Sequence, residues 1–210
     1  MKMIYGTTNE GKLAMVRRAL ADMPEIELMG LKELGPALPV PEETGTTPLE
    51  NARIKGLAYY RAFRMPVLSS DTGLYLEGIK EELQPGVHVR TVGGRCLTDE
   101  EMTEYYSNLA KKYGDIIAQY QNAACLVWDE THLYECTDER LSGSKFLLTA
   151  VPHPRREPGF PLDCLSRDLA THAYYYDMEG EQQDDVTFAK GIADFFREAL
   201  KMRAQIQERE

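Results

Sequence analysis

The sequence predicts an α/β fold, with a central mixed sheet, helices on its faces and two lobes divided by a cleft. Two observations predict this class. The first part of the chain alternates short apolar runs with segments of helical periodicity, which is typical of βα units. A middle region of paired strand patterns and a final helix follow, and this order favours a mixed sheet. A chain of 210 residues can bury one core, so we expect a single domain over residues 1–210.

The first predicted element is a strand–loop–helix unit. Residues 1–5, MKMIY, form a short apolar strand, and the polar sequence GTTNEGK follows as a loop. Helical periodicity then runs from about Lys12 to Met23. The loop is therefore expected at the carboxyl end of the strand, where open α/β sheets bind ligands. The sequence EIELMGL predicts a second strand.

A capping box marks the start of the next helix. Thr47 is followed by Pro48 and, three residues after the threonine, by Glu50. A threonine N-cap, a proline at the first helical position and a glutamate at the third predict a helix over residues 48–63. The apolar sequence MPVLSS, residues 65–70, then predicts a buried strand.

The remaining elements follow from similar signals. Thr98 with Glu101 forms another capping box and predicts a helix that ends near Gly114. The sequences IIAQYQNAACLVWDE and THLYECTDERLSG are partly alternating and predict two paired strands, and KFLLTAV predicts a further strand. A terminal helix is predicted from its apolar side, which carries Phe188, Ile192, Phe195, Phe196, Ala199 and Leu200.

Composition argues against several classes of protein. The formal net charge of −10 disfavours a duplex nucleic-acid partner, which needs a cationic face. No segment approaches the ~20 apolar residues of a membrane helix, and the first residues do not read as a secretory signal. The four cysteines lack C-x-x-C spacing, so we expect reduced thiols and no structural zinc. These observations predict a cytoplasmic protein without a membrane or nucleic-acid partner.

The first segment that could carry chemistry is TTNEGK, residues 7–12. Backbone amides at a helix N-terminus attract anions, Thr7 and Asn9 can donate to phosphate oxygens, and Lys12 adds a positive charge. The spacing is not that of the G-x-x-x-x-G-K-[ST] phosphate loop. The alternative is an ordinary connection in which a threonine caps the helix.

The second segment is EETGTTPLENARIKG, residues 42–56. Glu50 is expected to serve the capping box, but Glu43 and Lys55 are not explained by it. Lys55 lies in the second turn, too far from the helix C-terminus to complement the helix dipole there. A functional interpretation places a glutamate on a metal and Lys55 on a phosphate. The alternative is a solvated helix face.

The third segment is VLSSDTGLYLEG, in which an apolar strand runs directly into Asp71, Thr72 and Gly73. An acid at the end of a buried strand, followed by a hydroxyl and a glycine, suits a hard cation such as Mg²⁺. The alternative is an Asx-turn that closes the strand.

Together the three segments resemble the inosine triphosphate pyrophosphatase family. They match, in order and spacing, the family patterns T-G-N-x-x-K, E-T-G-x-T-x-x-E-N-A-x-x-K-A and D-D-S-G-L followed by P-G-V. The resemblance covers about the first 95 residues. It implies an elongated fold, a homodimer and Mg²⁺-dependent hydrolysis of non-standard purine nucleoside triphosphates (ITP, dITP, XTP) to the monophosphate and pyrophosphate.

The resemblance also implies roles for individual residues. Asp71, Lys12 and Lys55 match the catalytic positions, and Glu43 and Asp71 match the metal ligands. The matching substrate-binding positions are Thr7, Asn9, Lys12, Lys55, Thr72, Gly73, Phe160 and Asp163.

The chain departs from the family pattern at several positions. Ser70 replaces the first acid of D-D-S-G, and no Ser-His-Arg motif occurs near the C-terminus, where the family reads the purine carbonyl. Residues 174–176, three tyrosines, could line a pocket or a dimer surface, or simply pack. Two alternatives therefore stay open: a pyrophosphatase for another modified nucleotide, and a non-catalytic nucleotide-binding protein.

Overall fold

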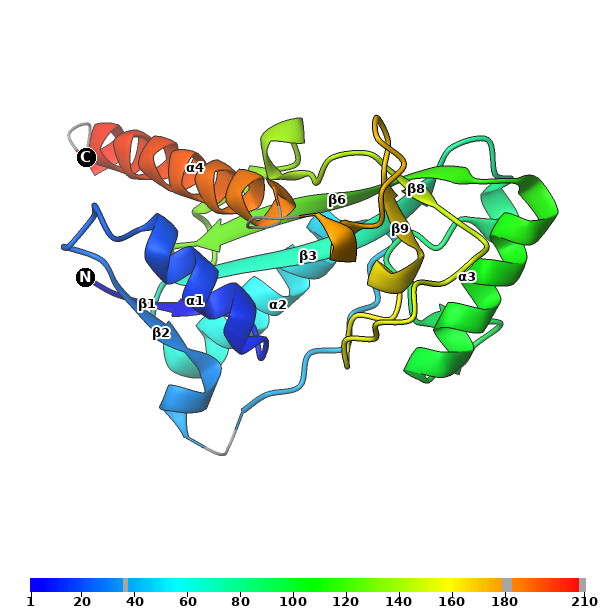
Figure 1. The fold of residues 1–210 in the computed structure, drawn as a ribbon. Coiled ribbons are helices and arrows are strands. Elements are labelled where there is room, and N and C mark those ends of the chain that lie inside the picture. The colour runs from blue at the N-terminus through cyan, green and yellow to red at the C-terminus, as the bar shows by residue number, and fades with distance from the viewer. Residues whose placement is uncertain (36–37, 179–182, 208–210) are drawn as a thin grey trace. The chain divides into compact units, whose positions relative to one another are not determined.

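The computed structural model describes residues 1–35, 38–178 and 183–207 and has a mixed α/β fold (Figure 1). Its helices are α1 (Glu10–Ala19), α2 (Pro48–Phe63), α3 (Asp99–Tyr113) and α4 (Gln183–Gln207). Its strands are β1 (Lys2–Tyr5), β2 (Glu27–Gly30), β3 (Val67–Leu76), β4 (Thr91–Val92), β5 (Arg95–Cys96), β6 (Ile116–Val127), β7 (Leu133–Cys136), β8 (Phe146–Leu148) and β9 (Ser166–Asp168).

The principal sheet is mixed, as predicted. Its strand order is β2-β1-β3-β6-β8-β9, with β7 paired to β6, while β4 and β5 form a separate two-stranded sheet. β1 pairs in parallel with both β2 and β3. β6 pairs antiparallel with β7 and β8, and β8 with β9. Parallel pairing thus belongs to the βα units and antiparallel pairing to the middle of the chain.

The chain divides into two compact units. Unit 1 comprises residues 1–72, 121–142 and 184–210, and unit 2 comprises residues 73–120 and 143–183. β3 and β6 each contribute residues to both units. The expected cleft stays a prediction.

Unit 1 buries both faces of its strands. Side chains alternate along β1, so Met3 and Tyr5 enter a core with α1 and α4, whereas Ile4 enters a core with α2. Figure 1 shows α1 and α4 on one side of these strands and α2 on the other. Gly56 allows α2 to approach closely, because a Cβ there would lie 2.8 Å from the Ser69 hydroxyl oxygen.

Unit 2 has its own core, formed by α3 against β8 and the segments around it. Tyr106 and Phe146 are its largest fully buried side chains. Tyr175 and Tyr176 are partly buried and pack against this cluster. For these two tyrosines the structure therefore favours the packing alternative.

The helix predictions hold with one correction at a boundary. The boxes at Thr47 and Thr98 are formed, and α2 and α3 have their predicted extents. The prediction that the first helix reaches Met23 is wrong, because α1 ends at Ala19. Pro24 disfavours helical geometry at the residue before it, and a turn instead brings Leu20 and Met23 into the core.

The predicted end of the third strand is also wrong. β3 continues through Asp71 and Thr72 to Leu76, so no Asx-turn closes it at the aspartate. β1 stops at Tyr5, which pairs with Leu68, while β6 remains the neighbour of β3 on its other side. Extended backbone is therefore maintained past the end of β1, and Asp71 lies within a strand.

Candidate functional site

The predicted residues of unit 1 gather where β1 ends and β3 continues. Beyond Leu68, the paired partner of Tyr5, β3 has no β1 residue beside it. Lys12 in the first turn of α1 and Lys55 in α2 both reach this stretch of β3. Because successive residues of a strand point to opposite faces, Asp71 meets α2 and Thr72 meets the beginning of α1.

Lys55 joins the two predicted metal ligands. Its Nζ atom lies 2.7 Å from Asp71 Oδ1 and 3.1 Å from Glu43 Oε2. The side chains of Lys55 and Asp71 are only 13% and 15% exposed, whereas that of Glu43 is 43% exposed. The sequence-based grouping of these three residues is therefore present in the fold, with one ammonium between two carboxylates.

Asn51 supports Asp71 from α2, the helix that also carries Lys55, and it is not among the residues predicted from the sequence. Its Nδ2 donates to Asp71 Oδ2 at 3.3 Å, and its Oδ1 accepts from the Gly45 backbone N–H at 2.8 Å. The residue is 2% exposed. Its spacing could have found it, because Asn51 precedes Lys55 by four positions and such residues share one helix face.

Lys12 reaches the neighbouring residue of β3. Its Nζ donates to Thr72 Oγ1 at 3.2 Å, and the Thr72 hydroxyl donates to Asn122 Oδ1 at 2.5 Å. Asn122 lies on β6, inside a strand pattern that carries no signal for a polar site. Only the pairing order of the strands brings it beside Thr72.

The loop residues Thr7 and Asn9 are used partly for local structure. Asn9, and not a threonine, caps α1 by accepting the Lys12 backbone N–H at 3.1 Å. Thr7 Oγ1 accepts the Asn9 backbone N–H at 3.2 Å. The alternative of a capping threonine is therefore wrong, and the loop presents the first turn of α1 beside the end of β1.

Glu50 serves the capping box, as expected. Its carboxylate accepts from the backbone N–H groups of Thr46 and Thr47 and from the Thr46 hydroxyl. These hydrogen bonds, first those from Thr46, lower the pKa of Glu50. Glu43 is thus the acid of this segment that faces Lys55.

Ser70, where the family pattern has an acid, is part of the core. It is 6% exposed, and its hydroxyl shares a 2.8 Å hydrogen bond with the hydroxyl of Tyr5. Burial raises the pKa of Tyr5 to about 12, and the bond to Ser70 opposes that shift. A buried hydroxyl pair therefore stands beside Asp71 in place of a second carboxylate.

The donor set fits a magnesium ion that is completed by a substrate. In proteins, Mg²⁺ is commonly held by one or two carboxylates together with substrate phosphates and water. Glu43 and Asp71 are two such carboxylates, and their shared contact with the Lys55 ammonium shows that they already surround a cation. Among the described residues, no group of three or more His, Cys, Asp or Glu side chains could hold a metal alone.

The remaining predicted residues lie in unit 2. Gly73 is buried, and a Cβ there would lie 3.2 Å from the Gly86 backbone, so close packing explains this glycine. Phe160 is 53% exposed, and Asp163 begins the short helical turn that follows it. The Asp163 backbone N–H donates to the Phe160 carbonyl at 3.3 Å, so these two residues share one turn.

The residues immediately before and after Phe160 in the sequence both form hydrogen bonds to α3. The Gly159 N–H donates to Asp99 Oδ2 at 2.8 Å, and the Thr103 hydroxyl donates to the Pro161 carbonyl at 3.0 Å. Arg90 contacts the other Asp99 oxygen at 2.7 Å. The Gly159 N–H and then the Arg90 guanidinium lower the pKa of Asp99.

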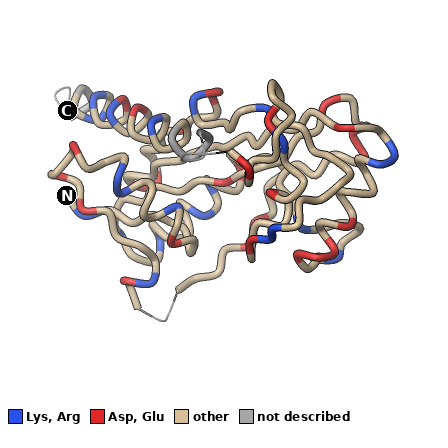
Figure 2. The backbone as a smooth tube through the Cα atoms, viewed as in Figure 1, with Lys and Arg blue, Asp and Glu red and all other residues tan. Residues whose placement is uncertain are grey.

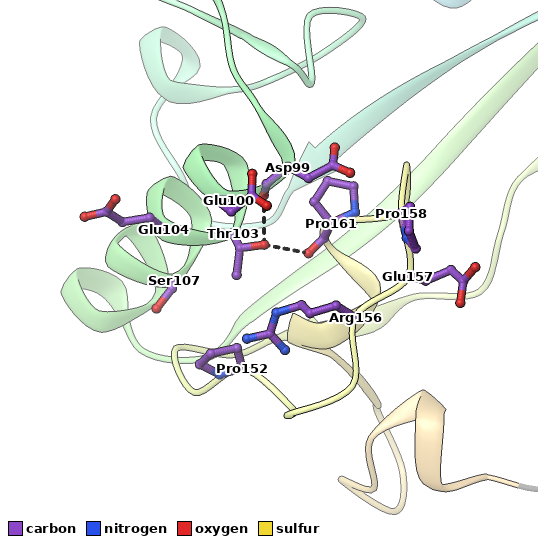
Figure 3. Close-up of a pocket in the computed structure, with 10 residues that line it drawn as sticks. All are labelled: Asp99, Glu100, Thr103, Glu104, Ser107, Pro152, Arg156, Glu157, Pro158 and Pro161. Atoms are coloured by element: carbon purple, nitrogen blue, oxygen red, sulfur yellow. Dashed lines mark hydrogen bonds between the residues drawn. The ribbon is translucent and has the colours of Figure 1, made fainter.

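A cavity of about 400 Å³ lies between α3 and this loop, again within unit 2. Figure 3 shows Thr103 directed toward Pro161, with Arg156 and Pro152 bordering the opposite side. Its acidic side chains are Asp99, Glu100, Glu104 and Glu157. None of the predicted site residues lines this cavity.

Charges are mixed along the described chain. Lys and Arg are interspersed with Asp and Glu along the backbone (Figure 2). None of the helices in the described residues is both long and apolar enough to cross a membrane.

Comparison with known proteins assigns the family. A sequence model described as the Ham1 family matches residues 3–186. The chain belongs to the Ham1 family. This confirms the resemblance found in the three segments.

Two Ham1 relatives align over most of the chain. The dITP/XTP pyrophosphatase of Thermus thermophilus is 36% identical over 167 residues, which cover 79% of this chain and 75% of that protein. The dITP/XTP pyrophosphatase of Rhodopseudomonas palustris is 30% identical over 167 residues, which cover 77% and 74%.

A solved structure has the same fold. The Staphylococcus aureus Ham1 protein superposes with a TM-score of 0.74 at 21% identity, covering 94% of this chain and 98% of that one. The mixed α/β fold with a central sheet and flanking helices is therefore that of a Ham1 protein.

Proposed function

We propose that this chain hydrolyses non-standard purine nucleoside triphosphates, such as dITP, ITP and XTP, to the nucleoside monophosphate and pyrophosphate. Membership of the Ham1 family and the two relatives named dITP/XTP pyrophosphatase support this proposal. The observation that carries it is the Lys55 ammonium held between Glu43 and Asp71, one residue along β3 from the contact between Thr72 and Lys12. In that arrangement, the two lysine ammonium groups would bind phosphates, and the two carboxylates would bind a metal and a water molecule.

The proposed chemistry follows from these groups. Water attacks the α-phosphorus, and the bond from that phosphorus to the departing pyrophosphate oxygen breaks. Negative charge spreads over the phosphoryl oxygens, where Lys12 and Lys55 stabilise it. The carboxylate of Asp71 accepts the proton that the water loses. Asn51, which already donates to the other oxygen of Asp71, orients that carboxylate.

Mg²⁺ is the proposed cofactor. Glu43 and Asp71 would hold it, and when bound it would supply neutralisation of the triphosphate and a lower pKa for a bound water. Binding of the substrate would draw the Lys55 ammonium from the carboxylates toward a phosphate.

The other assignments are proposals of the same kind. Thr7 and Asn9 would contact phosphate oxygens at the start of α1, and Thr72 and Gly73 would line the substrate beside Asp71. The exposed ring of Phe160 would stack on the base, with Asp163 close to it. We also propose a homodimer that works in the cytoplasm on nucleotides, without a nucleic-acid partner.

Substitution Asp71→Asn tests the function. The amide keeps the size of the side chain but cannot accept the proton, so kcat for ITP should fall by about 10²- to 10⁴-fold. The measurement is pyrophosphate release with Mg²⁺ across a panel of nucleotides. Asp115→Asn, at an exposed aspartate after α3, is the matched control and should retain wild-type rates.

Two results would contradict the proposal. Equal rates for Asp71→Asn and wild type would remove the role of Asp71. Tight binding of ITP and XTP without turnover would favour the non-catalytic alternative, for which the buried Ser70 is the supporting observation. Preference for some other modified nucleotide would instead support a changed substrate.

A further inference from the structure

We infer that Asn122 is a positioning residue that acts through the Thr72 hydroxyl to orient the Lys12 ammonium. The inference rests on the proposed function, because it assigns Lys12 to a triphosphate. It concerns a residue on β6 that contacts Thr72 and the Leu141 backbone. The residues concerned all belong to unit 1; they are Lys12, Thr72, Asn122 and Leu141.

The Leu141 carbonyl determines which group donates in each hydrogen bond from Leu141 through Asn122 and Thr72 to Lys12. The Leu141 carbonyl can only accept, so the group of Asn122 that contacts it at 2.6 Å must be the amide NH₂. The amide oxygen then faces Thr72 and accepts its hydroxyl proton at 2.5 Å. The lone pairs of Thr72 Oγ1 are left to accept from Lys12 Nζ at 3.2 Å.

This polarity explains why an amide suits position 122. A carboxylate would place an acceptor against the Leu141 carbonyl, and an apolar side chain would leave that carbonyl without this donor. Leu141 is fully buried, and Asn122 is half-buried between β3 and the Leu141 segment. A buried polar group that loses its hydrogen-bond partner costs more free energy than the bond contributes when it is present. The orientation of the Asn122 amide is therefore strongly favoured.

The consequence for Lys12 is a preferred direction of its ammonium. A lysine side chain has high rotamer entropy, which it must lose when it binds a phosphate. Thr72 immediately follows Asp71 on β3, so a hydroxyl whose proton is committed to Asn122 draws the ammonium toward the reaction site. Part of the ordering is thereby present before substrate binds.

The test measures binding of inorganic triphosphate by calorimetry, together with KM and kcat for ITP. Asn122→Leu should weaken triphosphate binding and raise KM, each by about tenfold, which is the effect of one charge-linked hydrogen bond. Asn108→Leu, at an exposed asparagine on α3, is the matched control and should change neither.

A double-mutant cycle separates positioning from general stability. If Asn122 acts through the ammonium, Asn122→Leu should have no further effect in a Lys12→Met background. Thr72→Val breaks the same connection and should mimic Asn122→Leu, while Thr72→Ser keeps the hydroxyl and should restore binding. These threonine variants test the inference even if Asn122→Leu folds poorly.

The inference is overturned if Asn122→Leu and Thr72→Val bind triphosphate as tightly as wild type. It is also overturned if Asn122→Leu weakens binding equally with and without Lys12, or if wild-type protein does not bind triphosphate. Absence of pyrophosphate release from wild type, with triphosphate binding intact, would contradict the proposed function alone.

Discussion

Lys55 has a charge environment that a surface lysine would not need. Its ammonium is mostly shielded from water and lies between the carboxylates of Glu43 and Asp71. Partly buried charges are tolerated when they are paired and hydrogen-bonded. Removal of one partner leaves the remaining charge without compensation for its loss of hydration. Three charged side chains at one point therefore fit the phosphate and metal site proposed for them.

Ser70 and Tyr5 give a pH-dependent prediction. Burial raises the pKa of Tyr5 from its ordinary value of 10.0 to about 12 in the folded protein. Its stabilising contribution is therefore complete below pH 10 and is lost as the pH rises from 10 to 12. The loss should approach about 3 kcal/mol across that range.

Substitution Tyr5→Phe isolates this effect. At neutral pH the variant should be less stable by about 1 kcal/mol, because Ser70 loses its partner. Between pH 10 and 12 its free energy of unfolding should fall less steeply than that of wild type. Denaturant unfolding at several pH values measures both slopes, and parallel slopes would show that Tyr5 does not titrate as described.

At the scale of elements, local sequence signals set the helix starts. Both capping boxes are formed, and α2 and α3 begin at the residues that the boxes predict. The strand that holds Asp71 behaves differently, because its length depends on its neighbours β1 and β6 and not on its own residues. Aspartate has a low strand propensity, but it can continue a strand when neighbouring elements satisfy its polar side chain.

The loop around Phe160 gives a prediction about substrate selection. Asp99 anchors this loop through the Gly159 N–H, and Arg90 holds the carboxylate. In Asp99→Asn the anchor weakens, so KM for ITP should rise several-fold while binding of inorganic triphosphate, which has no base, stays unchanged. Phe160→Ala should raise KM further, by about tenfold, because a stacking contact is lost.

The control for this prediction is Glu100→Gln, at the next residue of α3, which is exposed. It removes one negative charge without touching the Gly159 bond. Equal KM values for Phe160→Ala and wild type would show that the ring does not contact the base. An equal loss of triphosphate binding in Asp99→Asn would assign the effect to the fold.

At the scale of the whole molecule, the net charge of −10 opposes binding of a polyanionic substrate. Local cations must therefore outweigh it, and Lys12 and Lys55 supply two of them. A divalent ion that neutralises the triphosphate would supply the rest. This balance predicts a strict requirement for a metal.

Metal removal checks that requirement. Chelation with EDTA should abolish pyrophosphate release, and Mg²⁺ should restore it. The melting temperature should not change on chelation, because the described residues contain no group of three or more ligating side chains that would hold a structural ion. Full activity in EDTA would remove the metal from the proposal, and a large drop in melting temperature would indicate a structural site.

The sequence alone determined the fold class and the starts of α2 and α3, and it singled out Glu43, Lys55, Asp71 and Lys12 as candidate site residues. Capping boxes and apolar periodicity involve residues a few positions apart in the chain, so they are visible in the sequence. A long sequence motif is visible in the same way, because its residues have a fixed spacing. Only the tertiary structure decided that Asp71 lies within β3, that Asn51 contacts Asp71 and that Asn122 contacts Thr72. The hydrogen bond from Thr72 to Asn122 joins residues 50 positions apart, and the one from Lys12 to Thr72 joins residues 60 apart. Such contacts depend on strand pairing and the termination of β1, and no local pattern of residues encodes them.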